Sequence, residues 1–432
     1  MPCSLALLLI SLLAFIALKM PIGFALAISS TLYLVTSDRA FSLTIIPTRI
    51  VDGLDSYPFL AVPFFIMAAH FMNAAGITQR IFDFALSLVG HIKGGLGHVN
   101  IMASMIFSGM SGAAVADTAG LGLIEIRAMI KEGYSRAISA AITAASAIIG
   151  PIIPPSITLV IYGVLAEVSV GRLFLAGILP GLAMGFSMML MVYFLAATGR
   201  EHMPTRPRQS LCQIWQSFRR AFLTLLAPII LISGIAFGVV TPTEAGVVAV
   251  IYAIILGIYY REILLAHLPR ILGDTALQTA AVMFLLAGAT IFGWILTVER
   301  VPTMVTVFML GLTDNPLILL FLINLLLLGL GMFLNSSTIL VLTIPILKPL
   351  LPIIGVDPVH FGIIMTMNVM IGMLTPPLGI CLYIAADIAQ TPFEKVFRAV
   401  IPFYVPLFIV LLLITYFPGW VMFLPDLFLP VR

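Results

Sequence analysis

Two stretches decide the fold of this chain: IGPIIPPS at residues 149–156 and IGMLTPPL at residues 371–378. Each lies inside a long apolar segment, 137–165 or 359–386, and each carries two adjacent prolines. A proline removes a backbone donor and clashes with the preceding helical turn, so a helix must unwind there. In lipid the freed carbonyls need partners, and such a break persists only where it is buried or lines a cavity. The sequence therefore predicts two broken helices at membrane depth.

The composition indicates a protein embedded in a lipid bilayer. Its 432 residues are 61% hydrophobic and 9% charged, whereas a soluble domain carries about 25% charged residues. This excludes a soluble enzyme, a nucleic-acid-binding protein, a disordered chain and a small disulfide scaffold. The net charge of +3 is too small to indicate a nucleic-acid partner, and the three cysteines are too scattered for a metal site. We expect an all-α polytopic membrane protein.

Apolar segments of roughly 20 residues, the length that spans a bilayer, recur along the chain. We predict ten spans, at residues 4–18, 22–36, 58–75, 137–165, 173–197, 221–239, 243–260, 276–297, 359–386 and 399–417. The apolar stretches 96–126 and 317–350 are interrupted by small and polar residues, which predicts re-entrant hairpins. The more amphipathic segments 78–92 and 301–313 are predicted to be connecting arms along the interface. Segment 4–18 lacks a basic flank, so we interpret it as a retained helix and not a signal peptide.

The two halves of the chain repeat the same turn-forming residues at one offset. Four features recur 222 residues apart: Gly109-Met110 and Gly331-Met332, Gly133 and Gly355, Gly150 and Gly372, and Pro154-Pro155 and Pro376-Pro377. The alternative to a duplication is that these matches only reflect how common glycine and proline are in membrane helices. We predict a first repeat over 1–197, a linker over 198–220 and a second repeat over 221–432. Each repeat holds five spans and one hairpin. Because five is odd, the second must be inverted, which is the architecture of many secondary transporters.

Basic residues are distributed unequally between the two sides. With these spans, fifteen of the 21 lysines and arginines fall on one side and six on the other. Basic residues favour the cytoplasm, so the linker 198–220 is assigned to it and both termini are assigned to the periplasm. The sequence has no G-x-x-x-x-G-K-[ST] loop, so energy for transport would come from an ion gradient or a partner. It has no nucleophile–base pair, and we expect no enzymatic activity.

Polar residues gather at the hairpin tips. The first tip carries Ser108, Ser111, Asp117 and Thr118, and the second carries Asn335, Ser336, Ser337 and Thr338. Freed carbonyls suit Na⁺, and the N-termini of half-helices attract anions. Three roles are open for Asp117: a cation ligand, a proton carrier or a cap of a hairpin helix. Asn335 or Ser336 could equally cap a helix, and a proline kink without a ligand is the alternative for either break alone.

The most specific motifs of the chain lie in the block 95–163. They are HVNI at 98–101, SGMSG at 108–112, ADTAG at 116–120 and GPIIPPS at 150–156. Together with PFFIM at 63–67 and TPTEAG at 241–246, this block closely resembles the large membrane subunit of tripartite ATP-independent periplasmic (TRAP) transporters. The resemblance covers nearly the whole chain. It implies an elevator-type, Na⁺-coupled importer of organic acids in the cytoplasmic (inner) membrane of a bacterium or archaeon.

The resemblance also implies two partners. One is a small four-helix membrane subunit, expected on a separate chain, and the other is a soluble periplasmic binding protein that delivers the substrate. The alternative is a stand-alone Na⁺/carboxylate symporter without a binding protein. The sequence leaves the organic acid open. Static scaffold spans are expected at 4–36, 58–75, 221–260 and 276–297, with 4–36 and 221–260 holding the small subunit, while the hairpins and broken helices move as one transport domain.

The family's sites map onto this sequence as two Na⁺ sites and one substrate site. The first Na⁺ site would use Ser108, Gly112, Asp117, Thr118, Gly150, Pro151 and Pro154, and the second Gly331, Ser337, Thr338, Gly372, Thr375 and Pro376. The substrate would contact Ser111, Ser156, Asn335 and Ser336. Leu378 stands in the second repeat where Ser156 stands in the first, so substrate recognition would depend mainly on one half.

Overall fold

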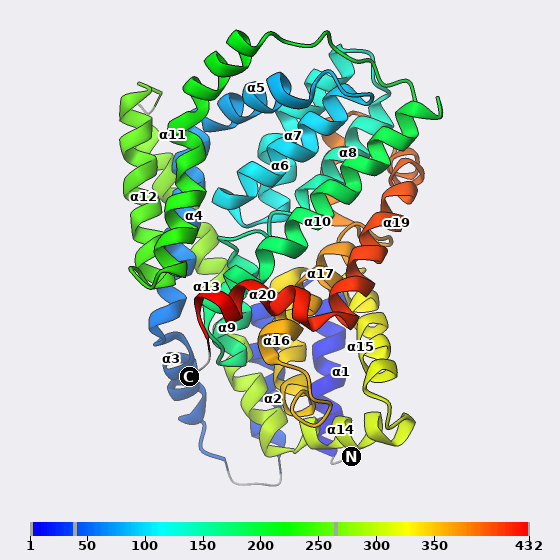
Figure 1. The fold of residues 1–432 in the computed structure, drawn as a ribbon. Helices are drawn as coiled ribbons and strands as arrows, with labels where there is room; N and C mark the ends of the chain where they lie inside the picture. Colours follow the sequence, from blue (N-terminus) through cyan, green and yellow to red (C-terminus); the bar gives the residue numbers. More distant parts are fainter. Residues whose placement is uncertain (1–2, 38–40, 263–266, 431–432) are drawn as a thin grey trace.

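The computed structural model describes residues 3–37, 41–262 and 267–430, and the regular structure in these ranges is entirely helical (Figure 1). The all-α class is confirmed. Among the described residues, six helical segments are long and apolar enough to cross a membrane: Tyr57–Ala74 (η1, Tyr57–Leu60, with α4, Ala61–Ala74), α10 (Val170–Ala197), α11 (Leu211–Ala236), α12 (Pro242–Tyr259), α13 (Leu268–Val298) and α19 (Phe393–Tyr416). Shorter apolar helices include α1 (Cys3–Ala17) and α2 (Ile22–Thr36), which pack against each other.

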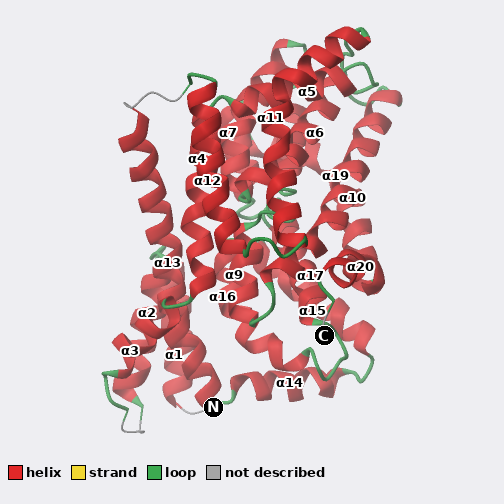
Figure 2. Ribbon diagram, turned by 60° about the vertical axis from the view of Figure 1, so that its left-hand side comes forward, coloured by secondary structure: helices red, strands yellow, loops and turns green. Residues whose placement is uncertain are grey.

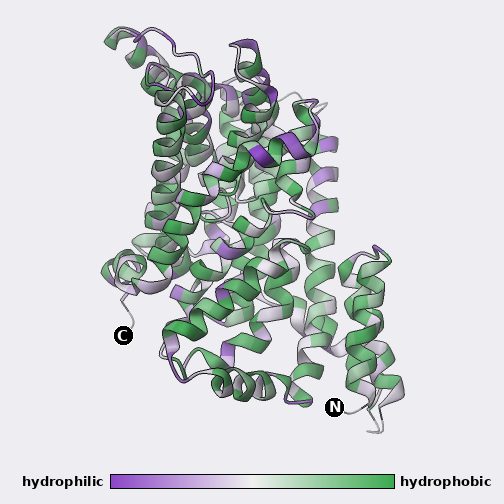
Figure 3. Ribbon diagram, turned by 90° about the vertical axis from the view of Figure 1, so that its right-hand side faces the viewer, coloured by the Kyte–Doolittle hydropathy of each residue, from purple (hydrophilic) through white to green (hydrophobic). Residues whose placement is uncertain are grey.

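The outer surface of the long helices is apolar, as a bilayer requires. On α10, Phe186 is 63% exposed and Leu190 69%, and on α12 Ile258 is 67% exposed. In water, each Å² of such apolar surface would cost about 25 cal/mol, whereas lipid covers it without that cost. Figure 3 shows hydrophobic residues along the long helices and hydrophilic ones concentrated towards the upper end of the molecule.

Two helical hairpins occupy the interrupted apolar stretches. The first consists of α6 (Gly95–Ser111) and α7 (Ala114–Lys131), and the second of α15 (Pro316–Gly331) and α16 (Ser336–Leu347). α6 ends at Gly112, whose φ of 62° lies in the left-handed region that glycine adopts without strain. α16 is capped by Asn335, whose side chain accepts the Thr338 N–H at 3.0 Å.

Two helices are interrupted where the prolines predict it. α8 (Arg136–Ala147) is separated from α9 (Ile157–Ala166), and α17 (Pro358–Gly372) from α18 (Ile380–Ile388). Both proline–proline peptide bonds, 154–155 and 376–377, are cis. α18 packs against α7 and α8, whereas α9 packs against α16 and α17. Each half of the chain therefore contributes a half-helix to the other, and loop segments lie in the centre of the molecule (Figure 2).

The two connecting arms lie at opposite ends of the molecule. α5 (Ile77–Val89) lies at the upper end of Figure 1, as does the segment 198–210, and α14 (Val301–Leu312) lies at the lower end. α5 packs against α11, and α14 packs against α16. Both termini are in the lower half of the view.

Three segments differ from the sequence-based expectation. The irregular stretch after α10 covers 198–210 and not 198–220, because Ser210 and Gln213 form a capping box that starts α11 early. The pattern predicts neither α3 (Ile45–Leu54) nor α20 (Pro418–Phe428), since both are short and contain proline and charged residues. α20 is held by tertiary contacts: Arg172 on α10 pairs with Asp426 at 2.6 Å.

Candidate functional site

The first hairpin tip packs directly against the first helix break. A Cβ on Gly112 would lie 2.6 Å from the carbonyl oxygen of Pro155 and 3.0 Å from the backbone nitrogen of Ile157. A Cβ on Gly109 would lie 3.6 Å from the carbonyl oxygen of Pro154. At Gly112 only glycine permits this approach of two backbones, so the tip packs directly on the backbone of the break.

Asp117 faces that same break. It lies in the first turn of α7 and is buried, and a Cβ on Gly150 would lie 2.3 Å from its Oδ2 atom. A negative charge near a helix N-terminus is favourable. Thr118, also buried, donates its hydroxyl to Ala114 O at 2.8 Å. The buried carboxylate of Asp117 therefore lies beside the first helix break.

Two buried serines of the first half are engaged locally. Ser156 donates its hydroxyl to Pro151 O at 2.5 Å and accepts the Leu159 N–H at 3.1 Å, so it caps α9. Ser108 donates to Met105 O at 2.6 Å. Each serine therefore donates its only hydroxyl proton to a backbone carbonyl oxygen. The side chain of Ser111 lies outside the described part of the chain.

The second tip and the second break are in contact through two glycines. A Cβ on Gly331 would lie 2.9 Å from the Cα of Gly372. At the start of α16, Asn335 Oδ1 accepts both the N–H of Thr338 at 3.0 Å and its hydroxyl at 2.6 Å. Thr375 donates its hydroxyl to Ile371 O at 3.0 Å, and Pro376 follows it in the break, partly exposed. Asn335 therefore acts as a cap in this conformation.

A cavity of about 280 Å³ lies where both tips and both breaks meet. Four of the residues that the sequence predicts at a binding site line this cavity: Gly112, Pro151, Ser336 and Ser337. Met370 and Met373 line it from the second break, and Ile66 of α4 and Gln278 of α13 line it from outside the hairpins. Its described lining does not include Ser156 or Asn335. The cavity therefore joins the two halves of the chain, with the first residues of α16 directed to it.

Buried polar networks tie each hairpin to its neighbouring broken helix. Asn100 on α6 donates to Thr143 of α8 at 2.7 Å and accepts from Ser146 of α8 at 2.7 Å. In the second half, Asn368 of α17 donates to Asn324 of α15 at 2.8 Å. Paired polar groups inside a protein favour one relative position of the helices that carry them. In the second network Asn368 Oδ1 has no hydrogen-bond partner among the described residues. Side-chain hydrogen bonds therefore link each hairpin to its adjacent half-helix.

Sequence reasoning missed three residues of this region. Gln278 and Thr158 line the cavity, and Glu125 is fully buried eight residues after Asp117 on α7. Within the described residues, neither carboxylate oxygen of Glu125 has a hydrogen-bond partner. Two features of the sequence could have identified two of them. Gln278 is a lone amide in an apolar span, and Glu125 is an ionisable residue inside a predicted hairpin.

Comparison with known proteins gives one consistent family. The family described as "Tripartite ATP-independent periplasmic transporter, DctM component" matches residues 9–420. The chain is 47% identical to the sialic acid TRAP transporter large permease protein SiaM of Vibrio cholerae, over 95% of this chain and 96% of that protein. It is 36% identical to the C4-dicarboxylate TRAP transporter large permease protein DctM of Pseudomonas aeruginosa, over 92% of each chain.

The fold is also found in a solved structure of a more distant protein. The YdaH transporter of Alcanivorax borkumensis is similar with a TM-score of 0.66 and 13% identity, over 87% of this chain and 88% of that one. At this identity the likeness concerns the fold alone. The family match over nearly the whole chain decides the assignment and confirms the resemblance seen in the sequence: the chain belongs to the DctM component family, the large permease proteins of TRAP transporters.

Proposed function

We propose that this chain, the large permease of a TRAP transporter for organic acids, couples import to Na⁺ and moves its substrate by an elevator mechanism. The observation that carries the proposal is the cavity of about 280 Å³ lined by both hairpins and both helix breaks. Its partners are a small membrane subunit and a periplasmic binding protein, as the family implies. Its chemistry is transport and not catalysis.

An inverted repeat is the architecture that we propose. Its support is the common offset of 222 residues and the placement of the hairpins. In Figure 1 the first hairpin lies in the upper part of the molecule and the second in the lower part. Such a pair of opposed hairpins around one cavity allows access to alternate between the two sides of the membrane.

We propose one Na⁺ site at each contact between a tip and a break. The first uses Asp117, the backbone of Gly112 and Gly150, and carbonyls of the 150–154 segment, with Ser108 and Thr118 beside them. The second uses the backbone around Gly331 and Gly372, with Ser337, Thr338, Thr375 and Pro376 beside them. Support comes from the close backbone approach at both places, which brings carbonyl oxygens of the tips and the breaks together.

For the substrate, we propose a carboxylate bound at the start of α16. Ser336 and Ser337 line the cavity there, and a helix N-terminus offers free N–H groups to an anion. Sialic acid is the first candidate, because the 47% identical relative is named for it. The C4-dicarboxylates named for the Pseudomonas relative are the second.

The test is uptake by proteoliposomes that contain this chain and its small subunit. With an inward Na⁺ gradient and a sialic-acid-loaded binding protein, we expect uptake that rises with Na⁺ with a Hill coefficient above one. Replacing Na⁺ by choline should stop it. Uptake that persists in choline contradicts Na⁺ coupling, and equal uptake without any binding protein identifies a stand-alone symporter.

Topology gives a separate prediction. The charge distribution assigns the end of the molecule that carries 198–210 to the cytoplasm. The exposed thiol of Cys212 should therefore resist a membrane-impermeant maleimide in intact cells, in a variant with Cys3→Ser. Asp314→Cys, in the exposed turn before α15, should react, and permeabilised cells should label both. Labelling of Cys212 from outside would reverse the orientation.

The serines of the two halves should behave differently when replaced by alanine. Ser336→Ala combined with Ser337→Ala should raise the half-saturating substrate concentration roughly 10- to 100-fold. The two changes remove hydroxyls that would donate hydrogen bonds to the charged carboxylate of the substrate. Ser156→Ala should instead lower the amount of folded protein and leave the affinity unchanged, because Ser156 caps α9. Uptake normalised to folded protein separates the cases. A large loss of affinity in Ser156→Ala would return Ser156 to the substrate site.

A further inference from the structure

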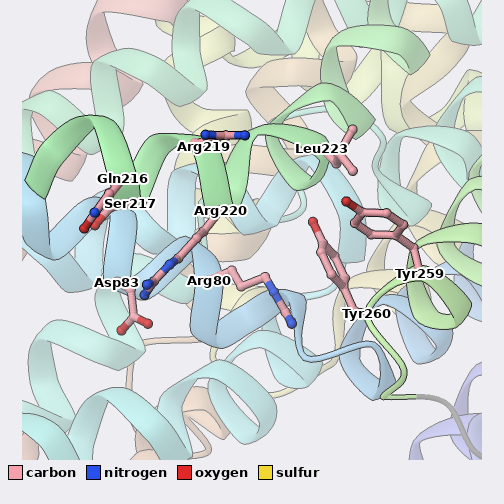
Figure 4. Close-up of a pocket in the computed structure, with 9 residues that line it drawn as sticks. All are labelled: Arg80, Asp83, Gln216, Ser217, Arg219, Arg220, Leu223, Tyr259 and Tyr260. Carbon is pink, nitrogen blue, oxygen red and sulfur yellow. The ribbon is translucent and has the colours of Figure 1, made fainter. Parts of the chain in front are cut away.

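A pocket of about 560 Å³ lies at the upper end of the molecule, where α5 and the start of α11 are found. Among the described residues, it shares no lining residue with the cavity of about 280 Å³ between the hairpin tips. α5, the first half of α11 and the end of α12 form its walls. Figure 4 shows Arg220 reaching from α11 towards Asp83 of α5, while Arg80 points towards Tyr260, which follows Tyr259 at the end of α12. Three arginines and one aspartate make the lining strongly positive.

The arginines of this pocket divide into one that is anchored and two that are not. Arg80 donates to Gly76 O at 2.8 Å, lies 3.8 Å from the ring centre of Tyr260, and contacts Glu262 at 3.4 Å. Arg219 and Arg220 are exposed, and neither forms an ion pair with any residue that the structure describes. The described lining of the pocket thus holds three guanidinium groups against the single carboxylate of Asp83, towards which Arg220 is directed (Figure 4).

The pocket borders an apolar strip that is exposed on α12, within the span 221–260 expected to hold the small subunit. Along α12, Ile251, Ile255 and Ile258 are each more than half exposed, and they lead to Tyr259 at the rim of the pocket. Tyrosine is enriched at the level of lipid headgroups, where its ring is apolar and its hydroxyl is hydrated. A ligand that fits both features has an anionic head and an apolar tail.

We propose that this pocket binds the headgroup of an anionic phospholipid, with Arg219 and Arg220 contacting its phosphate and its acyl chains lying on the α12 strip, at the edge of the surface expected to hold the small subunit. Arginine is suited to phosphate because its planar group donates two parallel hydrogen bonds. Basic pockets between membrane helices on the cytoplasmic side are known phospholipid sites in general. The proposed topology assigns this pocket to that side. α5 joins α4 to the first hairpin, so the lipid would sit where the scaffold meets the arm.

The test is native mass spectrometry of the full chain with its small subunit, titrated with phosphatidylglycerol or phosphatidylethanolamine. Wild type should retain one phosphatidylglycerol in preference to phosphatidylethanolamine. R219Q/R220Q should bind phosphatidylglycerol roughly 30-fold more weakly, at about 1 kcal/mol per arginine near the surface. R200Q/R208Q, with the same charge loss on exposed residues outside the pocket, should bind like wild type.

Control variants and competitors keep the proposal falsifiable. R219K/R220K retains the charge and should keep most of the binding, which guards against a folding defect in the glutamine variant. Unchanged phosphatidylglycerol binding by R219Q/R220Q would overturn the proposal. So would equal competition by glycerol 1-phosphate, which identifies a soluble anion as the ligand, or loss of the small subunit from R219Q/R220Q, which identifies a protein contact.

Discussion

Replacing Asp117 by asparagine should abolish Na⁺-driven uptake while leaving the protein folded. The carboxylate is buried, and a Cβ on Gly150 would lie 2.3 Å from its Oδ2. Asparagine keeps the shape and one acceptor oxygen but removes the charge. In the proposed site the Asp117 carboxylate pairs with the bound Na⁺. Loss of one member of a buried charge pair costs about 3–5 kcal/mol, so the half-saturating Na⁺ concentration should rise by roughly 100-fold or more.

The measurement is initial uptake against Na⁺ concentration in proteoliposomes, normalised to folded protein. Asp387→Asn is the matched control, because Asp387 is an exposed carboxylate on α18 and should tolerate the change. An unchanged Na⁺ dependence in Asp117→Asn would assign Asp117 to helix capping. Wild-type uptake that follows a pH gradient in choline, and that is lost in Asp117→Asn, would make it a proton carrier.

The elements found from the sequence are those whose cause is local. Adjacent prolines at 154–155 and 376–377 break a helix whatever surrounds them, so the interruptions lie where the pattern predicts them. Gly112 ends α6 because only glycine enters the left-handed region cheaply. The class and the interrupted helices therefore followed from residue types alone, whereas the family came from the resemblance of the motifs in 95–163 to a known family.

The elements missed from the sequence depend on contacts between distant segments. α20 is positioned by Arg172, more than two hundred residues away, and its own pattern is too short to predict a helix. Gln278 lines the cavity only because α13 passes beside both hairpins. Ser156 could be a substrate ligand or a cap from its sequence position, and its hydroxyl direction, which depends on the folded break, favours the cap. Burial of a carboxylate such as Glu125 is likewise a property of packing.

Of the changes that add one methyl group at the proposed second Na⁺ site, Gly372→Ala should be the most damaging to transport. A Cβ there would lie 2.5 Å from the Cα of Gly331 and 2.7 Å from its carbonyl carbon. Both are backbone atoms, which cannot rotate away as a side chain does, so the tip must move off the break. Overpacking of this kind costs about 1–3 kcal/mol, and it separates the carbonyls that would share an ion. Na⁺-driven uptake should fall roughly 10-fold or more.

The control for this change is Gly329→Ala, two residues before Gly331 on the same helix. A Cβ on Gly329 meets nothing within 4 Å, and alanine favours a helix over glycine by up to about 1 kcal/mol. Gly329→Ala should therefore match wild type in uptake and equal or exceed it in thermal stability. If Gly372→Ala also behaves like wild type, the second tip does not depend on its glycine contact, and the second Na⁺ site cannot lie between them. If only Gly372→Ala loses uptake while remaining folded, that contact is where the second ion is held.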